Sequence, residues 1–154
     1  MKLLHSIACV LIGYSALASV APGEALADRV IEVDPAISAA LRFGRYTQDV
    51  NERVQELADR GASMESSLQS ALAGTTGRSQ RRQLVKLFKQ AWKIERDQCR
   101  DAISALSDEA KQVLSFHAAG IALYPAIDGV KQDAFQRINE IFQDSNRSFD
   151  AALR

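Results

Sequence analysis

Apolar side chains recur every three or four residues through most of the chain, starting near residue 35. This is the period of an amphipathic helix, in which such residues share one face. No stretch alternates apolar and polar residues in the manner of a β-strand, and no internal repeat is present. The pattern therefore predicts an all-α protein whose short loops favour an antiparallel helical bundle.

Start and stop signals divide this pattern into four or five helices. Asp34 and Pro35 begin the first, because Asp caps free backbone N–H groups and Pro fits the first helical position. Gly61 is expected to end it, since glycine commonly follows a helix C-terminus. A short second helix is expected from Ser63 to the Gly-Thr-Thr-Gly loop at residues 74–77.

The third expected helix, residues 78–106, is the longest and best patterned. Ser107 and the two acidic residues after it are expected to cap a fourth helix. Tyr124-Pro125 breaks or kinks that helix, because proline removes a backbone donor, and a last helix carries residues 127–149. The expected bundle interior includes Leu41, Val54, Leu84, Phe88, Ala91, Leu106, Leu114, Ile138 and Ile141.

Residues 1–27 have the pattern of a secretory signal peptide. Lys2 supplies a positive charge, residues 3–21 are almost continuously apolar, and an Ala-Leu-Ala tripeptide ends at Ala27. Small residues at these positions are typical of a signal-peptidase site. We expect cleavage after Ala27 and export to the bacterial periplasm or the medium.

Cleavage would leave a short extension, residues 28–33, and one helical domain, residues 34–154. One alternative is an uncleaved membrane anchor, because the apolar run approaches the roughly 20 residues that span a bilayer. Another is a lipoprotein attached through Cys9, although little hydrophobic sequence precedes that cysteine. After cleavage, no segment is expected to span a membrane stably.

Charge and cysteine content exclude several classes of function. Nineteen Lys and Arg residues balance nineteen Asp and Glu residues, so net charge does not direct the chain to nucleic acid. Only Cys99 would remain after cleavage, which excludes an intramolecular disulfide. No haem-attachment, zinc-type or catalytic motif is present. We therefore expect a non-enzymatic protein without a cofactor.

A basic stripe lies on the expected third helix, with positive residues at steps of three and four between positions 78 and 100. Such spacing places them on one helix face, where they could bind an acidic partner. The expected contact residues are Arg78, Arg81, Arg82, Lys86, Lys89 and Lys93. Arg96 and Arg100 have acidic neighbours and are expected to be neutralised locally. Alternatively, the stripe pairs with an acidic stripe on the first helix, formed by Asp49, Glu52, Glu56 and Asp59.

A weaker candidate site consists of Glu95, Cys99 and His117. If the helices that carry them were antiparallel neighbours, these side chains could bind a metal or form a Cys–His nucleophile. The simpler interpretation is that Cys99 and His117 are ordinary core residues.

The leading hypothesis is an interaction protein of the bacterial envelope, acting as an inhibitor, chaperone or accessory subunit. It would bind another envelope or secreted protein through a helix face or groove. The alternative is a bundle that binds a small molecule or metal near Glu95, Cys99 and His117. The sequence leaves open whether the protein forms a homo-oligomer.

Overall fold

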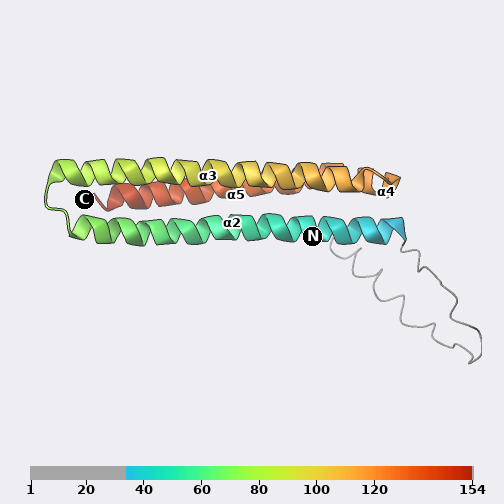
Figure 1. Ribbon diagram of the computed structural model, residues 1–154, viewed down its shortest axis with the longest axis horizontal. Helices are drawn as coiled ribbons and strands as arrows, with labels where there is room; N and C mark the ends of the chain where they lie inside the picture. The colour runs from blue at the N-terminus through green and yellow to red at the C-terminus, as the bar shows by residue number, and fades with distance from the viewer. Residues whose placement is uncertain (1–33, 154) are drawn as a thin grey trace, which may run out of the picture. The chain divides into compact units, whose positions relative to one another are not determined.

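The computed structural model describes residues 34–153. The expected signal peptide (residues 1–27), its cleavage site and the extension at residues 28–33 lie outside this range. The described residues form the helices α2 (Pro35–Ala73), α3 (Arg78–Leu114), α4 (Ala118–Ile121) and α5 (Tyr124–Ala151), and no strand. Figure 1 shows the three long helices side by side, with α4 a single turn between α3 and α5.

The expected bundle of four to five helices is not confirmed: three long helices form the bundle, because two predicted breaks lie inside continuous helices. α2 passes through Gly61 and Ser63, and α3 passes through Ser107. Gly61 and Ser107 are both buried. Packing between helices therefore outweighs the local preference of these residues for a helix end.

Gly61 lies where α2 packs closely against α3 and α5. A β-carbon there would lie 3.0 Å from Ser145 Oγ and 3.1 Å from the Trp92 ring. The missing side chain lets the three helices meet at this level. A glycine that resembles a stop signal in the sequence is thus a packing residue in the fold.

Two other signals have the expected structural effect. The Asp34 carboxylate accepts a hydrogen bond from the Ala36 N–H at 2.8 Å, and Pro35 begins α2. Pro125 lies in the first turn of α5, so Tyr124-Pro125 marks the start of a separate helix rather than a kink. Both features follow from interactions between residues adjacent in the sequence, so the sequence alone predicts them.

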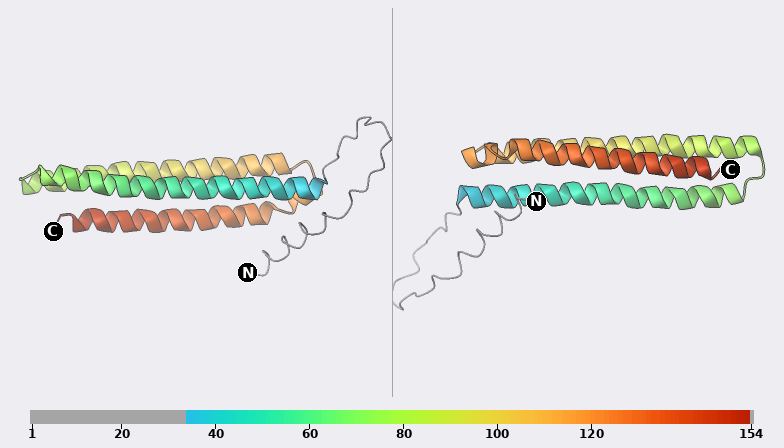
Figure 2. Two further views of the ribbon diagram at one scale, coloured as in Figure 1. Left: turned by 90° about the horizontal axis from the view of Figure 1, so that it is seen from below. Right: turned by 180° about the vertical axis from the view of Figure 1, so that it is seen from behind.

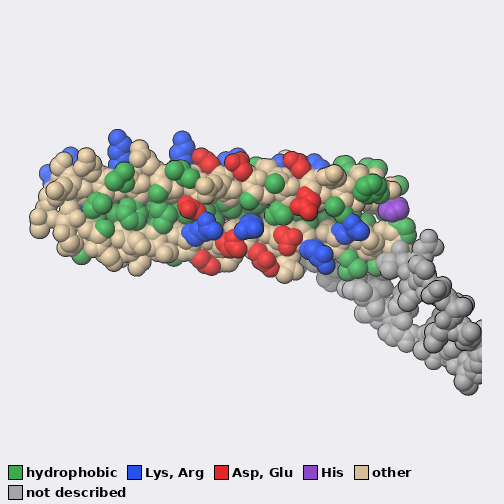
Figure 3. Space-filling model, in the orientation of Figure 1, with side chains coloured by type: hydrophobic (Ala, Val, Ile, Leu, Met, Phe, Trp, Pro, Cys, Tyr) green, Lys and Arg blue, Asp and Glu red, His purple; other side chains and the backbone are tan. Residues whose placement is uncertain are grey.

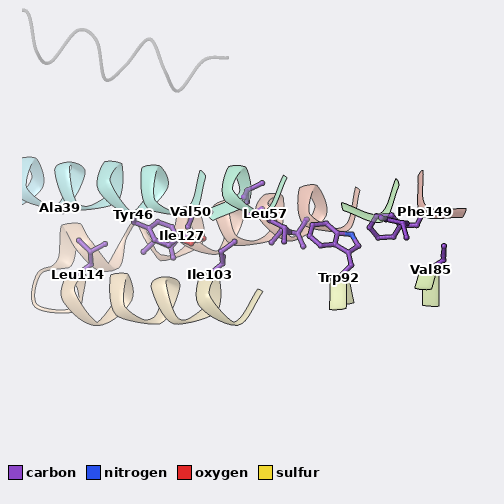
Figure 4. Close-up of a cluster of buried hydrophobic side chains, with 14 of the residues drawn as sticks. Ala39, Tyr46, Val50, Leu57, Val85, Trp92, Ile103, Leu114, Ile127 and Phe149 are labelled. Atoms are coloured by element: carbon purple, nitrogen blue, oxygen red, sulfur yellow. Dashed lines mark hydrogen bonds between the residues drawn. The ribbon is translucent and has the colours of Figure 1, made fainter. Parts of the chain in front are cut away.

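One hydrophobic core runs along the three long helices, each of which packs against the other two. Figure 4 shows its buried side chains, among them Tyr46 and Leu57 from α2, Trp92 and Ile103 from α3, and Phe149 from α5. Figure 2 shows the same helices from below and from behind. Among residues 34–153, no helix is both long and apolar enough to cross a membrane.

The expected interior residues fall into three groups. Val54, Leu114 and Ile138 are buried in the core. Leu84, Phe88, Leu106 and Ile141 are partly buried against it. Leu41 and Ala91 are exposed, Leu41 to 69% of its surface, so their assignment to the interior is wrong. Both lie on helix faces turned away from the core, which spacing along α2 or α3 alone does not reveal.

Candidate functional site

The C-terminal half of the basic stripe packs against α5. Arg96 donates a 2.6 Å hydrogen bond to Asp97, and its guanidinium lies 4.4 Å from the centroid of the Phe142 ring. Arg100 lies 4.5 Å from the centroid of Phe135. Cations over aromatic faces are attracted by the ring quadrupole. These two arginines therefore cover aromatic rings of the bundle.

The N-terminal half of the stripe borders a groove between α3 and α5, which we call the basic groove. Its volume is about 410 Å³. Its lining combines basic residues at the edge with an apolar floor: Arg82, Val85, Lys86, Lys89, Gln90, Lys93, Phe142, Asn146, Asp150 and Leu153. The floor packs on the hydrophobic core, because Phe142 stacks on the buried Trp92 ring with centroids 6.4 Å apart.

The basic groove keeps an excess of positive charge. Lys89 Nζ lies 2.6 Å from Asp150 Oδ1, and this exposed pair contributes about 0–1 kcal/mol. Arg82, Lys86 and Lys93 take part in none of the ion pairs of residues 34–153. Four basic side chains therefore face a single carboxylate in the groove lining.

The remaining two expected contact residues lie elsewhere. Arg81 donates a hydrogen bond to the Ala152 carbonyl at 3.3 Å, and its Nε is buried without a hydrogen-bond partner. Arg81 thus joins the end of α5 to the start of α3. Arg78 is exposed in the first turn of α3 and is not part of the groove lining.

The acidic stripe of α2 does not pair with the basic stripe in the described ion pairs. Three of its residues instead bond within α2: Glu56 with Arg53, Glu52 with Gln48 and Asp59 with Gln55. The salt bridge between α2 and α3 has its basic residue on α2 and its acidic residue on α3, the reverse of the expected pairing. It joins Arg60 to Glu95 at 2.6 Å. That hydrogen bond raises the pKa of Arg60 above its ordinary value.

Glu95, Cys99 and His117 do not come together. Glu95 and Cys99 line a groove of about 190 Å³ between α2 and α3. His117 lies beyond the end of α3 and lines a different groove. Cys99 is fifteen helical residues before Leu114, a rise of roughly 20 Å. Within residues 34–153, no group of three or more His, Cys, Asp or Glu side chains is placed to hold a metal ion.

Cys99 is partly buried and packs against the hydrophobic core. Its Sγ lies 3.6 Å from the Arg53 carbonyl oxygen and donates a weak hydrogen bond to it. Burial raises the pKa of the thiol, against the opposing effect of the Arg53 and Arg60 charges. Because the thiolate is the nucleophile, this environment disfavours reactivity at neutral pH.

The sequence interpretation missed an apolar surface at the end of the bundle where α2 begins and α3 ends. Ile37, Leu41, Phe116 and Ile121 are all exposed there. A groove of about 620 Å³ between α2 and α3 is lined by Leu41, Leu106 and Val113, among others. The exposure of Phe116 depends on where α3 ends, and the sequence interpretation placed that end eight residues too early.

Comparison with known protein families, curated protein sequences and solved structures finds no significant match. The information about function therefore comes from the fold and the surface of the described residues. It is a bundle of three long helices that carries a cationic groove with an apolar floor.

Proposed function

We propose that this protein is a non-enzymatic interaction module that binds an acidic amphipathic segment of a partner protein in the basic groove. The observation that supports this most is the combination of four basic side chains with an apolar floor and one balancing carboxylate. Amphipathic helices bind such grooves by burying their apolar face and leaving charged residues at the edges.

The dimensions of the groove favour a helical segment as the ligand. Arg82 and Lys93 are eleven residues apart on α3, which corresponds to about 16 Å, or three helical turns. Between them, Lys86 and Lys89 follow at steps of four and three residues. A ligand helix with carboxylates at steps of three or four residues presents charges at the same intervals.

The setting of this interaction follows from residues 1–27, whose signal-peptide pattern supports export. The partner is then another envelope or secreted protein, and this chain acts as an inhibitor, chaperone or accessory subunit. We do not propose the alternative metal-binding function, because His117 lies in a different groove from Glu95 and Cys99.

Binding of a synthetic peptide tests the proposal. The probe is a fluorescently labelled helical peptide with leucines on one face and glutamates on the other. We expect its anisotropy to rise with protein concentration. Added salt should weaken the binding, because exposed charges are screened over about 8–10 Å at physiological ionic strength. A control peptide has lysine in place of glutamate and should bind much more weakly.

The charge-reversal variant Arg82→Glu/Lys86→Glu should weaken peptide binding about tenfold or more, because it places like charges against the ligand. The matched control, Arg42→Glu/Arg45→Glu, makes the same change of charge on α2, outside the groove. Both variants should keep the parent stability to within about 0.5 kcal/mol. Equal loss in both variants, or stronger binding to anionic phosphatidylglycerol vesicles than to the peptide, would contradict the proposal.

A further inference from the structure

The face of α3 opposite the core carries apolar side chains that do not line the basic groove. Leu87 and Ile94 are 59% and 58% exposed. They are seven residues apart, so they lie in line along one side of the helix, as in the seam of a coiled coil. Ala91, Gln98 and Ala105 are exposed along the same side. We call this line the outer seam.

Charged side chains beside the outer seam change sign halfway along α3. Lys86 and Lys93 lie in its N-terminal half, and Asp101 and Asp108 lie in its C-terminal half. At 3.6 residues per turn, these four positions fall within about a quarter of the helix circumference. Figure 3 shows Lys and Arg side chains projecting from the edge of α3 towards its N-terminal end, and Asp and Glu side chains farther along.

These four charges are free to meet another molecule. All of them are exposed, and none belongs to an ion pair among residues 34–153. Their order is also symmetric about Asp97. Lys86 and Asp108 lie eleven residues to either side of it, and Lys93 and Asp101 lie four residues to either side.

We propose that α3 of a second copy of this chain covers the outer seam in the antiparallel orientation, about a twofold axis near Asp97. A twofold axis between antiparallel helices brings the same edge of both helices together. Lys86 then meets Asp108 of the partner subunit, and Lys93 meets Asp101 of the partner subunit. Each pair occurs twice, which gives four intermolecular ion pairs.

The charge pattern selects this orientation over a parallel one. In a parallel pairing about a twofold axis, the charged edges of the two helices would lie on opposite sides of the interface, so the lysines and aspartates of the two copies would not meet. In the antiparallel pairing, only Asp97 approaches its own copy. Arg96 compensates that carboxylate with hydrogen bonds of 2.6 and 2.9 Å.

The outer seam supplies the apolar part of the interface. In this register, Leu87 lies near Ala105 of the partner subunit and Ile94 lies near Gln98 of the partner subunit. Alanine at positions 91 and 105 permits close approach of the two helices. The apolar residues are few, so we expect a dimer that dissociates on dilution and at high salt.

The outer seam is separable from the basic groove. Lys86 and Lys93 border both surfaces, whereas Leu87, Ile94 and Asp101 are not part of the groove lining. Substitutions at these three positions therefore test the dimer and leave the groove residues in place.

Sedimentation equilibrium of the purified protein tests the proposal. The parent should show a monomer–dimer equilibrium that shifts towards monomer as salt increases. Lys93→Asp and Asp101→Lys should each weaken the dimer about tenfold or more, because each places like charges in contact. The double variant Lys93→Asp/Asp101→Lys should restore the dimer, since it exchanges the two charges across the same contact. A purely structural effect of either substitution would not be rescued in this way.

Exposed leucine and isoleucine residues provide the matched control. Ile94→Ser should weaken the dimer, whereas Leu41→Ser, at another exposed position, on α2, should not. A parent protein that is monomeric at all concentrations would overturn the proposal. So would a double charge exchange that fails to restore the dimer, or a dimer that depends on Leu41.

Discussion

Glycines at three positions inside the long helices have different surroundings, which predict opposite effects of an added methyl group. A β-carbon at Gly44 or Gly129 would have no neighbour within 4 Å, whereas one at Gly61 would lie 3.0 Å from Ser145 Oγ. Gly44→Ala and Gly129→Ala should each stabilise the fold by about 0.5–1 kcal/mol, because glycine loses more conformational entropy in a helix. Gly61→Ala should destabilise it by about 1–3 kcal/mol through overpacking.

Urea denaturation monitored by circular dichroism measures all three glycine variants, and Gly44→Ala and Gly129→Ala are the controls for Gly61→Ala. If Gly61→Ala were as stable as the other two, α2 would not approach Trp92 as closely as described.

Tyr46 makes the stability of the fold depend on pH in the alkaline range. Its side chain is buried, and its hydroxyl donates a hydrogen bond to the Ile127 carbonyl at 3.2 Å. Burial raises the pKa of this hydroxyl above its ordinary value of 10.0. A group whose pKa is higher in the folded than in the unfolded state contributes its full stabilisation at pH values below its unfolded pKa. This stabilisation is lost as the pH rises through the folded pKa.

Tyr46→Phe should therefore cost about 1 kcal/mol at pH 7 through the lost hydrogen bond. The parent should lose stability relative to this variant as pH rises above 10, because the variant lacks the buried phenol of Tyr46. Unfolding free energies in urea at neutral and alkaline pH measure the difference. A constant difference between the two proteins across this range would show that Tyr46 does not carry the alkaline effect.

At the scale of the helices, the sequence predicted features that depend on local chemistry. The cap at Asp34 and the start of α5 at Pro125 follow from side-chain capping and proline geometry, and both are present. The continuation of α2 through Gly61 depends on Trp92, a residue of another helix. Helical period identifies residues that share a face, but it does not fix how that face is rotated towards neighbouring helices.

The same limit applies to the basic stripe. Its spacing predicted a shared face on α3, and Arg82, Lys86, Lys89 and Lys93 indeed line one groove. The groove floor could not be predicted, because Phe142 and Leu153 come from the end of the chain. Arg81 lies about 100° around α3 from its neighbour Arg82, so its side chain leaves the groove and reaches the Ala152 carbonyl instead.

At the scale of the whole molecule, the two proposals are linked through Lys86 and Lys93. These lysines border both the basic groove and the outer seam. The acidic ligand and the second copy therefore compete for the same ammonium groups. Ligand binding should shift the sedimentation equilibrium towards monomer, since a ligand that binds only the monomer draws the equilibrium to it.

The proposed function depends on binding of an acidic helix in the basic groove. Nuclear magnetic resonance of the ¹⁵N-labelled protein, titrated with the acidic peptide, tests it most directly. We expect shifts in the amide signals of residues 82–93 and 142–153, and in the indole N–H of Trp92, the only tryptophan, whose ring stacks on Phe142. Signals of residues 37–45 should stay in place. Shifts centred on residues 37–45 and 106–121, or no shifts at saturating peptide, would contradict binding in the basic groove.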